Sequence, residues 1–538
     1  MDKRIDGTFQ QRTRTIGMGA LFAGIGLLAM VAMASYLTVR AILVAKADYA
    51  GAEVVVSIAL LLAEMFVLVH AFGYVASVLR AIWIRPRVEA AVLTHPEDFP
   101  EVDVLIPARH EDRKILERTL TAVVGMSYPR KTVWLLDDSS EPHYSREADE
   151  LARQFGIRVF RREVRHGAKA GIINDCLKQV TGKYVSIFDA DQCPMPFFLN
   201  RIVPLLEAND QLAFVQTPQF YANIGENRVA RAAGAQQAVF YEYICEAKGS
   251  SGAAFCCGTN VLFRREALTG VGGLDETSVT EDFATSVKLH SSGWKSLYYG
   301  EAYTMGLGPE TLAAYFRQQY RWARGTLGVG MRLLGLFLRK PGALSPLQWV
   351  DYGLSGTFYL VGWAYLILML CPIMYVLLGI PSYFVRPEIY AAAFLPYIVF
   401  AVLVFVGGLR KRHYTLRQMI SGQLLVFLAS PVHIRASLTA LFGVQSRFGI
   451  TPKGSSALIS LGMLWPQMLL CLVNYLVFLW GICRWIFEAD LAAGVNGFWA
   501  GVHFAVFWSV LYFREAMLSP SSRPRSTKLD MGLEVAAT

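Results

Sequence analysis

The chain has 538 residues, of which 54% are hydrophobic and 17% are charged, and its formal net charge is +9. Charged residues make up about a quarter of ordinary soluble proteins, so this composition excludes that class. The basic residues gather beside apolar segments, which is typical of oriented membrane helices rather than of a nucleic-acid-binding surface. The eight cysteines form no C-x-x-C pair, which favours free thiols over disulfides or zinc ligands.

The chain begins with two apolar segments that are each long enough to cross a bilayer, at residues 16–39 and 54–79. The first is longer than the apolar core of a signal peptide and has no small-residue cleavage pattern, so we expect a retained membrane helix. Four more spans are expected at residues 354–379, 389–409, 457–482 and 493–513. Residues 416–442 are also apolar, but basic residues and a proline interrupt them, and we interpret them as interfacial.

Lysine and arginine residues gather before the first span and after the second, fourth and sixth, whereas the loops on the other side carry few of them. The positive-inside rule therefore predicts that both termini and residues 80–350 lie in the cytoplasm. Glu64 and His70 fall within the second span, where polar groups are costly in lipid. They either line a polar pathway or lie near an interface lined by protein.

From about residue 99 to residue 306 the pattern changes to short apolar runs that alternate with polar helical stretches. Strands are predicted at 102–107, 132–136, 158–160 and 184–188, and helices at 113–124, 145–155 and 168–180. This alternation is typical of βαβ units, so we predict an α/β domain with a mostly parallel sheet. Such sheets bind ligands beyond the carboxyl ends of their strands.

Apolar residues at helical spacing, interleaved with arginines, predict basic amphipathic helices in the membrane interface at residues 307–350. The predicted organisation therefore has five parts. These are two N-terminal spans (1–90), the cytoplasmic α/β domain (91–306), the interfacial helices (307–350), four further spans that include an interfacial segment at 410–455 (351–513), and a disordered tail (514–538).

Acidic residues stand at the ends of two predicted strands. Asp137 and Asp138 follow the second strand, while Asp189 and Asp191 follow the fourth and are one residue apart. Either pair alone is more often a solvated turn or a helix cap. Carboxylates on neighbouring strand ends can also hold a hard divalent cation, which neutralises a diphosphate. Together the two pairs indicate a pocket for a nucleoside diphosphate.

Two further patches suit the same chemistry, although each has a simpler structural explanation. Lys169, within the stretch 166–171, can place an ammonium group near phosphate, or it is a solvated lysine at a helix start. Glu281 and Asp282 precede a predicted helix, where acids complement the helix dipole. In a sugar-binding pocket, one of these carboxylates can instead act as a general base toward a hydroxyl group.

An amide, a guanidinium and a large aromatic ring lie within about one helical turn, at Gln318, Arg321 and Trp322. This set suits hydrogen bonding to a sugar, contact with a diphosphate, and stacking on a pyranose ring. The structural alternative is an interfacial helix that is anchored by a tryptophan.

Taken in chain order, these patches resemble the family 2 inverting glycosyltransferases, specifically the cellulose synthase-like processive β-glycan synthases. The similarity runs through Asp137-Asp138, His166-Gly-Ala-Lys-Ala-Gly171, Asp189-Ala-Asp191, Phe255-Cys-Cys-Gly258, Thr280-Glu-Asp282, Gln318-Gln-Tyr-Arg-Trp322 and Phe448-Gly-Ile-Thr-Pro-Lys453. The last stretch looks like the gating loop of cellulose synthases. The resemblance implies a GT-A-like fold for the cytoplasmic domain, in a multi-pass enzyme of a bacterial inner (plasma) membrane.

The resemblance also implies a role for each matched residue. Donor binding would fall to Asp137, Asp138, Lys169, Asp189 and Arg321, and Mg²⁺ or Mn²⁺ would be held by Asp191 with Asp189. The implied catalytic residues are Glu281 and Asp282, with Asp282 as the general base. The acceptor would contact Gln318, Trp322, Cys257 and Gly258, while Phe448, Thr451 and Lys453 would close over the nucleotide.

The implied reaction is the polymerisation of glucose from UDP-glucose into a β-1,4- or β-1,3-glucan that leaves through the membrane helices. The implied partners are the growing polymer, the bilayer and accessory subunits for export, with no nucleic acid. Residues 255–260 depart from cellulose synthases beside the acceptor, so a curdlan-type or mixed linkage stays open.

Three rival readings remain. The gating-loop motif argues against a chitin- or hyaluronan-type synthase that uses UDP-N-acetylglucosamine. A non-processive transferase that builds a lipid-linked sugar would not need residues 318–322. A transporter with a cytoplasmic binding domain would leave Asp282 without a role.

Overall fold

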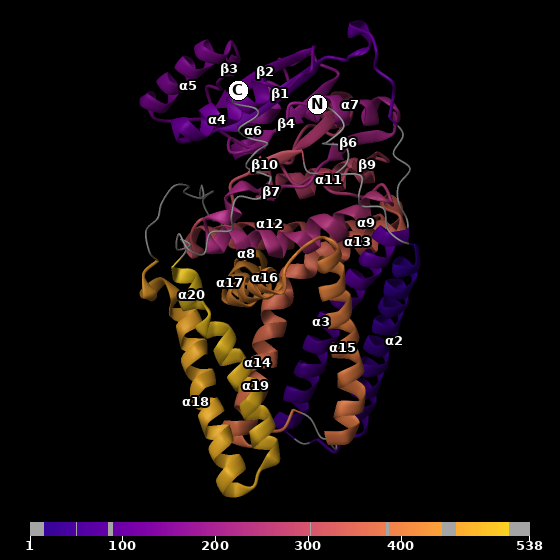
Figure 1. Cartoon of the computed structure of the whole chain (residues 1–538), viewed down its shortest axis with the longest axis vertical. Coiled ribbons are helices and arrows are strands. Elements are labelled where there is room, and N and C mark those ends of the chain that lie inside the picture. Colours follow the sequence, from indigo (N-terminus) through magenta and orange to yellow (C-terminus); the bar gives the residue numbers. More distant parts are fainter. Residues whose placement is uncertain are drawn as a thin grey trace.

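The computed structural model describes residues 16–49, 51–83, 90–301, 303–382, 387–443 and 459–515. It consists of an α/β domain that lies on a layer of long helices, with α12 and its neighbours between the two (Figure 1). The predicted arrangement, in which an α/β domain is inserted between membrane helices, is confirmed.

Among the residues that the structure describes, six stretches are long and apolar enough to cross a membrane, which confirms the predicted spans of a multi-pass membrane protein. Their bounds are Ala20–Lys46, Ala52–Trp83, Pro346–Leu378, Glu388–Lys411, Leu461–Glu488 and Leu491–Arg514. Most of these helices continue past the apolar run that predicted them. A seventh span is counted only if α16 (Leu416–Leu428) and α17 (Ser430–Leu441), which are bent by 43° at their junction, are taken as one.

Glu64 and His70 of the second span lie at contacts between helices. This span is α3 (Ala52–Trp83), which packs beside α2 (Ile16–Lys46). The Glu64 carboxylate accepts hydrogen bonds from Arg40 Nε at 2.6 Å and from Tyr36 Oη at 2.7 Å. The ring of His70 contacts the backbone oxygens of Phe66 and of Leu354. Of the two predicted alternatives, the structure therefore supports the interface lined by protein.

In the described part of the chain, the main sheet has seven strands in the order β3-β2-β1-β4-β8-β6-β9. Their bounds are β1 Val102–Ala108, β2 Lys131–Asp137, β3 Arg158–Phe160, β4 Tyr184–Ile187, β6 Leu212–Gln216, β8 Val261–Arg264 and β9 Lys295–Tyr298. Only β8 runs antiparallel to its neighbours, so the predicted mostly parallel sheet is confirmed. A small second sheet is formed by β5 (Cys193–Pro194), β10 (Thr304–Gly306) and β7 (Phe220–Tyr221).

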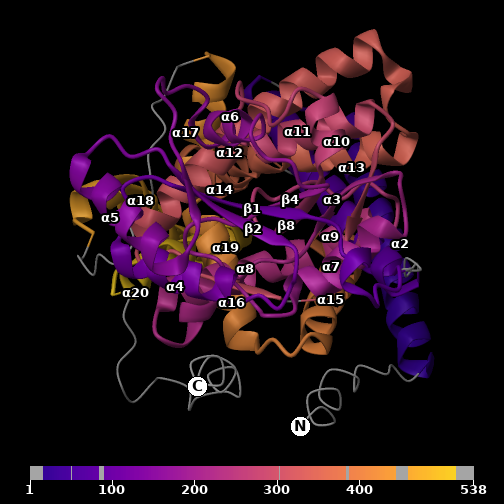
Figure 2. The ribbon, with the colours of Figure 1, turned by 90° about the horizontal axis from the view of Figure 1, so that it is seen from above.

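Helices cover both faces of the main sheet (Figure 2). One face carries α4 (Arg113–Val124), α5 (Pro142–Phe155) and α7 (Phe198–Glu207), and the other carries α6 (Ala168–Cys176), α10 (Arg265–Gly270) and α11 (Glu281–Ser291). Consecutive residues of β1 enter different cores, with Val104 in the first and Leu105 in the second. Because both faces of the sheet are buried, the sequences of these strands are continuous apolar runs.

The predicted helix at 168–180 is shorter in the structure, since α6 ends at Cys176. The chain continues in tighter turns, in which the Gln179 N–H donates to the Cys176 carbonyl only three residues back.

A layer of helices joins the domain to the spans. It contains α8 (Arg228–Val239), which continues through the π-helical turn η4 (Phe240–Ile244) into α9 (Cys245–Gly249), and the long helix α12 (Leu312–Arg339), which precedes α13 (Pro346–Thr357). α12 buries Leu327 and Leu333 but exposes Leu334 and Leu338. An exposed apolar stripe beside arginines is what an interfacial helix presents to lipid.

The C-terminal helices complete the membrane layer. They are α14 (Val361–Leu378), α15 (Pro387–Lys411), α18 (Trp465–Glu488), α19 (Leu491–Trp508) and α20 (Val510–Arg514). Short 3₁₀ turns occur elsewhere in the chain, at η2 (Pro96–Asp98), η3 (Ala222–Gly225), η5 (Pro341–Ala343), η6 (Phe358–Leu360) and η7 (Leu461–Leu464). α16 contacts α8 and α17 contacts α12, at the boundary between the two layers (Figure 1). The predicted gating-loop residues Phe448, Thr451 and Lys453 and the tail from residue 516 lie outside the described residues.

Candidate active site

One pocket brings the predicted site residues together at the carboxyl ends of β1, β2 and β4. Its volume is about 250 Å³, whereas a water molecule occupies about 30 Å³, so the pocket has room for an organic ligand. Within the described part of the chain, every predicted site residue except Asp137 lines it. These are Asp138, Lys169, Asp189, Asp191, Cys257, Gly258, Glu281, Asp282, Gln318, Arg321 and Trp322.

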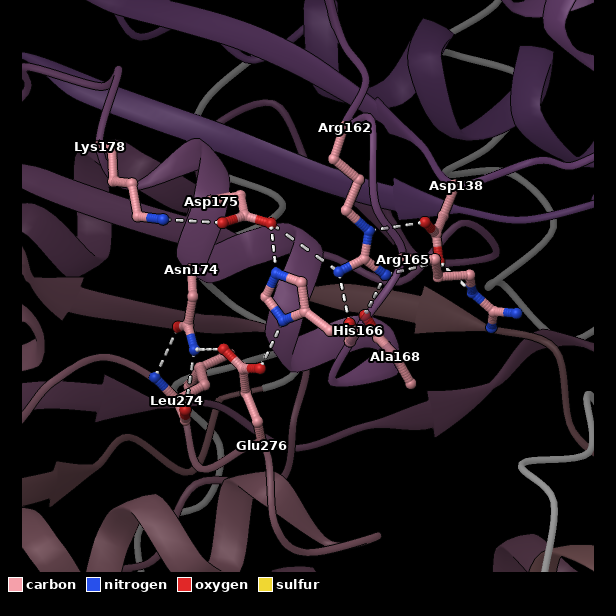
Figure 3. Close-up of polar contacts among 10 residues, drawn as sticks. All are labelled: Asp138, Arg162, Arg165, His166, Ala168, Asn174, Asp175, Lys178, Leu274 and Glu276. Atoms are coloured by element: carbon pink, nitrogen blue, oxygen red, sulfur yellow. Dashed lines mark hydrogen bonds and ion pairs between the residues drawn. The ribbon is translucent and has the colours of Figure 1, made fainter.

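The two adjacent aspartates at the end of β2 face different surroundings. Asp138 lines the pocket, and its carboxylate accepts hydrogen bonds from Arg162 at 2.9 and 3.0 Å and from Arg165 at 2.9 Å (Figure 3). Asp137 is buried and binds the Ser139 N–H and Arg161. It borders a small neighbouring recess instead of the main pocket. Successive residues at a strand end point to opposite sides, which explains the difference.

Lys169 projects from the first turn of α6 into the centre of the pocket. Its Nζ donates to Asp189 Oδ1 at 2.5 Å and to the Gly258 carbonyl at 2.7 Å. Burial lowers the pKa of Lys169, but the charges of Asp189 and Glu281 outweigh it and hold the pKa above its ordinary value. This side chain is therefore a fixed cation in the pocket, not the solvated lysine of the structural alternative.

Asp189 and Asp191 follow β4 and present two carboxylates to the pocket. The Asp189 N–H donates to Thr259 Oγ1 at 2.9 Å, which holds this turn against the loop before β8. No group of three or more His, Cys, Asp or Glu side chains suited to a metal ion occurs among the described residues. Magnesium is commonly bound by one or two carboxylates together with substrate phosphates and water, so this pair of oxygen ligands fits Mg²⁺ or Mn²⁺.

The loop at residues 255–260 forms the wall between Lys169 and Asp282. Gly258 has φ +82°, and a Cβ there would lie 3.0 Å from Asp282 Oδ2. Cys257 and Gly258 line the pocket, but Thr259 and Asn260 are fully buried behind it. The stretch at residues 255–260 therefore lies partly at the pocket wall and partly behind it. Its second half supports the Asp189 turn.

Glu281 and Asp282 begin helix α11. The Phe283 N–H donates to Asp282 Oδ1 at 2.7 Å, which orients the carboxylate. Burial and, second, the negative charge of Glu281 raise the pKa of Asp282 to about 7. A carboxylate whose pKa lies near neutrality can accept a proton efficiently, so this environment suits a general base.

Helix α12 closes the pocket from the side of the membrane layer. A Cβ at Gly325 would come within 2.6 Å of Thr280, so this glycine lets α12 lie directly against the start of α11. Gln318, Arg321 and Trp322 line the pocket from α12. The Gln318 carbonyl oxygen is buried and accepts no hydrogen bond from the residues that the structure describes, so it can accept one from a ligand.

Four further charged residues line the same pocket and were not predicted: Arg109, Glu111, Arg165 and Glu310. Arg109 and Glu111 follow β1, the central strand of the parallel half of the sheet. Their position after a predicted strand was a usable signal, because ligands bind at the carboxyl ends of such strands. Arg165 comes from the irregular segment after β3, for which strand and helix patterns carry no signal.

Comparison with known proteins extends this description. Residues 100–325 match the family model described as glycosyltransferase like family 2. The chain is 30% identical over 408 residues to the cellulose synthase catalytic subunit (UDP-forming) of Pseudomonas fluorescens, covering 73% of this chain and 52% of that protein. It is 26% identical over 470 residues to cellulose synthase 2 of Novacetimonas hansenii, covering 84% of this chain and 28% of the relative. The chain thus spans about half the length of the first relative and a smaller share of the second.

Among solved structures, a mannosyltransferase of Pyrobaculum calidifontis, in complex with GDP-Man and Mn²⁺, is similar with a TM-score of 0.49 and 18% identity. The similarity covers 72% of this chain and all of that one.

Proposed function

Residues 100–325 belong to glycosyltransferase family 2, and from this premise we propose that the protein is a membrane-embedded, processive, inverting glycosyltransferase. It transfers glucose from UDP-glucose to the end of a β-glucan and passes the polymer through its membrane helices. The similarity to UDP-forming cellulose synthases over 73% of the chain supports this donor and product.

The donor binds along the edge of the sheet in this proposal. Asp138 and Lys169 contact the nucleotide and its diphosphate, and Arg321 adds a second cation from α12. Asp137 supports this end of the site from behind, through Arg161. Asp189 and Asp191 would hold Mg²⁺ or Mn²⁺, and such a cation would neutralise the diphosphate as it leaves.

Asp282 is the proposed general base. It takes the proton from the terminal hydroxyl of the acceptor, whose oxygen attacks the anomeric carbon of the donor from the side opposite the diphosphate. A single displacement of this kind inverts the configuration, so an α-linked donor yields a β-linked product. Glu281 assists indirectly, because its negative charge raises the pKa of Asp282.

The acceptor end lies against α12 and the loop before β8. We assign Trp322 to stacking on the terminal sugar, Gln318 to a hydrogen bond with it, and Cys257 and Gly258 to the opposite wall. Phe448, Thr451 and Lys453 are proposed to close over the bound nucleotide. The domain and both termini would face the cytoplasm of a bacterium, with accessory subunits for export on the other side.

The observation that carries this proposal is the meeting of a cation, a carboxylate pair and a base in one pocket. Lys169 lies 2.5 Å from Asp189, and it binds the carbonyl of Gly258, which also borders Asp282. A transporter would not need a base with a raised pKa next to a cation-binding pair.

The test uses membranes that contain the full chain, incubated with Mg²⁺ or Mn²⁺ and one radiolabelled UDP-sugar at a time. We expect an insoluble polymer from UDP-glucose only, and digestion by a β-1,4- or a β-1,3-specific glucanase then defines the linkage. If polymer forms from UDP-N-acetylglucosamine instead, that sugar nucleotide is the donor and UDP-glucose is rejected. The absence of product with every UDP-sugar would reject the enzyme.

A further inference from the structure

The first turn of α6, which carries Lys169, is tied to the loop that leads into α11. His166 precedes this turn, and its two ring nitrogens contact two different carboxylates (Figure 3). Nδ1 lies 2.7 Å from Glu276 Oε2, and Nε2 lies 2.9 Å from Asp175 Oδ2. Glu276 belongs to the loop before α11, so the imidazole ring bridges the two segments.

The loop around Glu276 is fixed to α6 by a second set of contacts. The Asn174 side chain donates to the Leu274 carbonyl at 2.9 Å and accepts from the Leu274 N–H at 2.8 Å. It also donates to Glu276 at 2.7 Å. Gly167, with φ +56°, leaves the space that the Glu276 carboxylate fills, since a Cβ there would come within 2.3 Å of it.

The same loop is anchored to the helices on the acceptor side of the pocket. The Asp275 N–H donates to Thr285 of α11 at 2.8 Å, and the Asp275 carboxylate pairs with Lys288 of α11 at 2.9 Å. Arg332 of α12 donates to Thr277 at 2.8 Å. Glu276 therefore lies between two residues that are fixed to α11 and α12.

On the other side, Arg162 connects the α6 turn to the donor end of the pocket. Its guanidinium binds both oxygens of Asp138 and donates to the backbone carbonyls of His166 and Ala168 (Figure 3). The chain of contacts thus runs from Asp138 through the α6 turn and His166 to Glu276, and on to the helix of Asp282.

We propose that His166 and Glu276 form a latch, and that this latch is a positioning pair that holds the helix of Lys169 and the helix of Asp282 in register across the pocket. The inference rests on the proposed function, because the proposed function assigns Lys169 to donor binding and Asp282 to deprotonation of the acceptor. Neither latch residue touches the pocket, so both act through the helices that they join.

The latch is complete only while the imidazole carries a proton on both nitrogens. A neutral ring has one N–H donor, so its other nitrogen would face a carboxylate with a lone pair. The hydrogen bond to Glu276 is the largest of the influences that raise the pKa of His166. The charged groups around the ring are Glu276 from the loop, Asp175 from α6, and the cations Arg162 and Lys178, which both contact Asp175.

The sign of the pH effect follows from this charge. The imidazolium, and with it the full latch, is present at low pH and is lost as pH rises through the raised pKa of His166. Since Asp282 must be deprotonated to act as a base, its titration works in the opposite direction. The two groups together predict a bell-shaped dependence of kcat/KM on pH.

The experiment compares the wild type with His166→Gln and Glu276→Gln, all as full chains in lipid nanodiscs. The control Glu150→Gln removes an exposed ion pair of the same domain, between Arg113 and Glu150, that lies outside the latch. We expect kcat near neutral pH to fall about 10- to 100-fold in both latch variants, as small misplacements of reacting groups do. In His166→Gln, the fall of kcat/KM at alkaline pH should disappear, while the rise on the acid side should remain. The pH profile of the control Glu150→Gln should match that of the wild type.

Retention of the alkaline fall in His166→Gln, or wild-type kcat in both latch variants, would overturn the latch. A measurement that does not depend on enzyme activity separates a failure of the latch from a failure of the proposed function. Hydrogen exchange of the amides at residues 271–280, measured without substrate, should be at least about tenfold faster in His166→Gln than in the wild type, as local opening becomes less costly. If the protein makes no polymer, the exchange rate still tests the latch. An unchanged rate in His166→Gln overturns the latch, and a faster rate supports it.

Discussion

Replacement of Asp282 by asparagine isolates the chemistry of the proposed base from its structural role. The two side chains have nearly the same shape, and an amide oxygen can still accept the hydrogen bond that the Phe283 N–H donates to Asp282 Oδ1 at 2.7 Å. The N-terminus of α11 should therefore keep its conformation. The variant loses only the carboxylate that accepts a proton and the negative charge beside Glu281.

The size of the effect follows from what a positioned base contributes. General base catalysis accelerates reactions by about 10²- to 10⁴-fold, which corresponds to about 3–5 kcal/mol of barrier. We therefore expect kcat for polymer formation to fall at least about 100-fold in Asp282→Asn. Donor binding should change little, since Lys169 and Asp189 keep their contact at 2.5 Å.

Incorporation of radiolabelled glucose into insoluble polymer measures the rate, and calorimetric binding of UDP with Mg²⁺ measures the integrity of the donor site. Glu150→Gln again serves as the control, because its exposed pair with Arg113 lies away from the pocket. Activity of Asp282→Asn within about tenfold of the wild type, with normal UDP binding, would refute Asp282 as the base.

Three further outcomes are expected. First, kcat/KM of the wild type should rise with pH through about 7 on the acid side, because the raised pKa of Asp282 keeps the base protonated below that value; a rise centred near pH 4 in the pH–rate profile would contradict this environment. Second, EDTA should abolish polymer formation and Mg²⁺ or Mn²⁺ should restore it, while Asp191→Asn should require at least about tenfold more metal for half-maximal rate; full activity in EDTA would remove the metal from the mechanism. Third, Gly258→Ala should lower kcat by at least about tenfold, because its Cβ would lie 3.0 Å from Asp282 Oδ2 at a residue with φ +82°; the rate measured in the same assay should be unchanged if this wall does not border the reacting groups.

The α/β domain could be predicted well because its strands are buried on both faces. The apolar runs at β1 and β4 are dictated by two cores at once, so the signal is strong in the local sequence. The end of α6 was predicted less well, since the turn after Cys176 depends on packing and not on periodicity. The interfacial interpretation of residues 416–442 stays a prediction, and its helices break at Ala429.

The candidate site was predicted through motifs that lie at strand and helix ends, and the structure brings these motifs to one pocket. Which residue of an adjacent pair faces the pocket could not be predicted. Asp138 and Asp137 have the same chemistry, and only the direction of the chain leaving β2 separates the pocket from the recess behind it. Arg165 was missed because it enters the pocket from an irregular segment that has no motif of its own.

The sequence by itself predicted six apolar spans and a polar domain between them, since span length and strand burial are properties of contiguous residues. The described part of the chain contains six such spans. The sequence also determined the order of the acidic and aromatic patches along the chain. Only the tertiary structure decided which of these residues meet, and that Glu276 reaches His166 across 110 positions. Such contacts depend on strand register and on the rotation of packed helices, which no local pattern specifies.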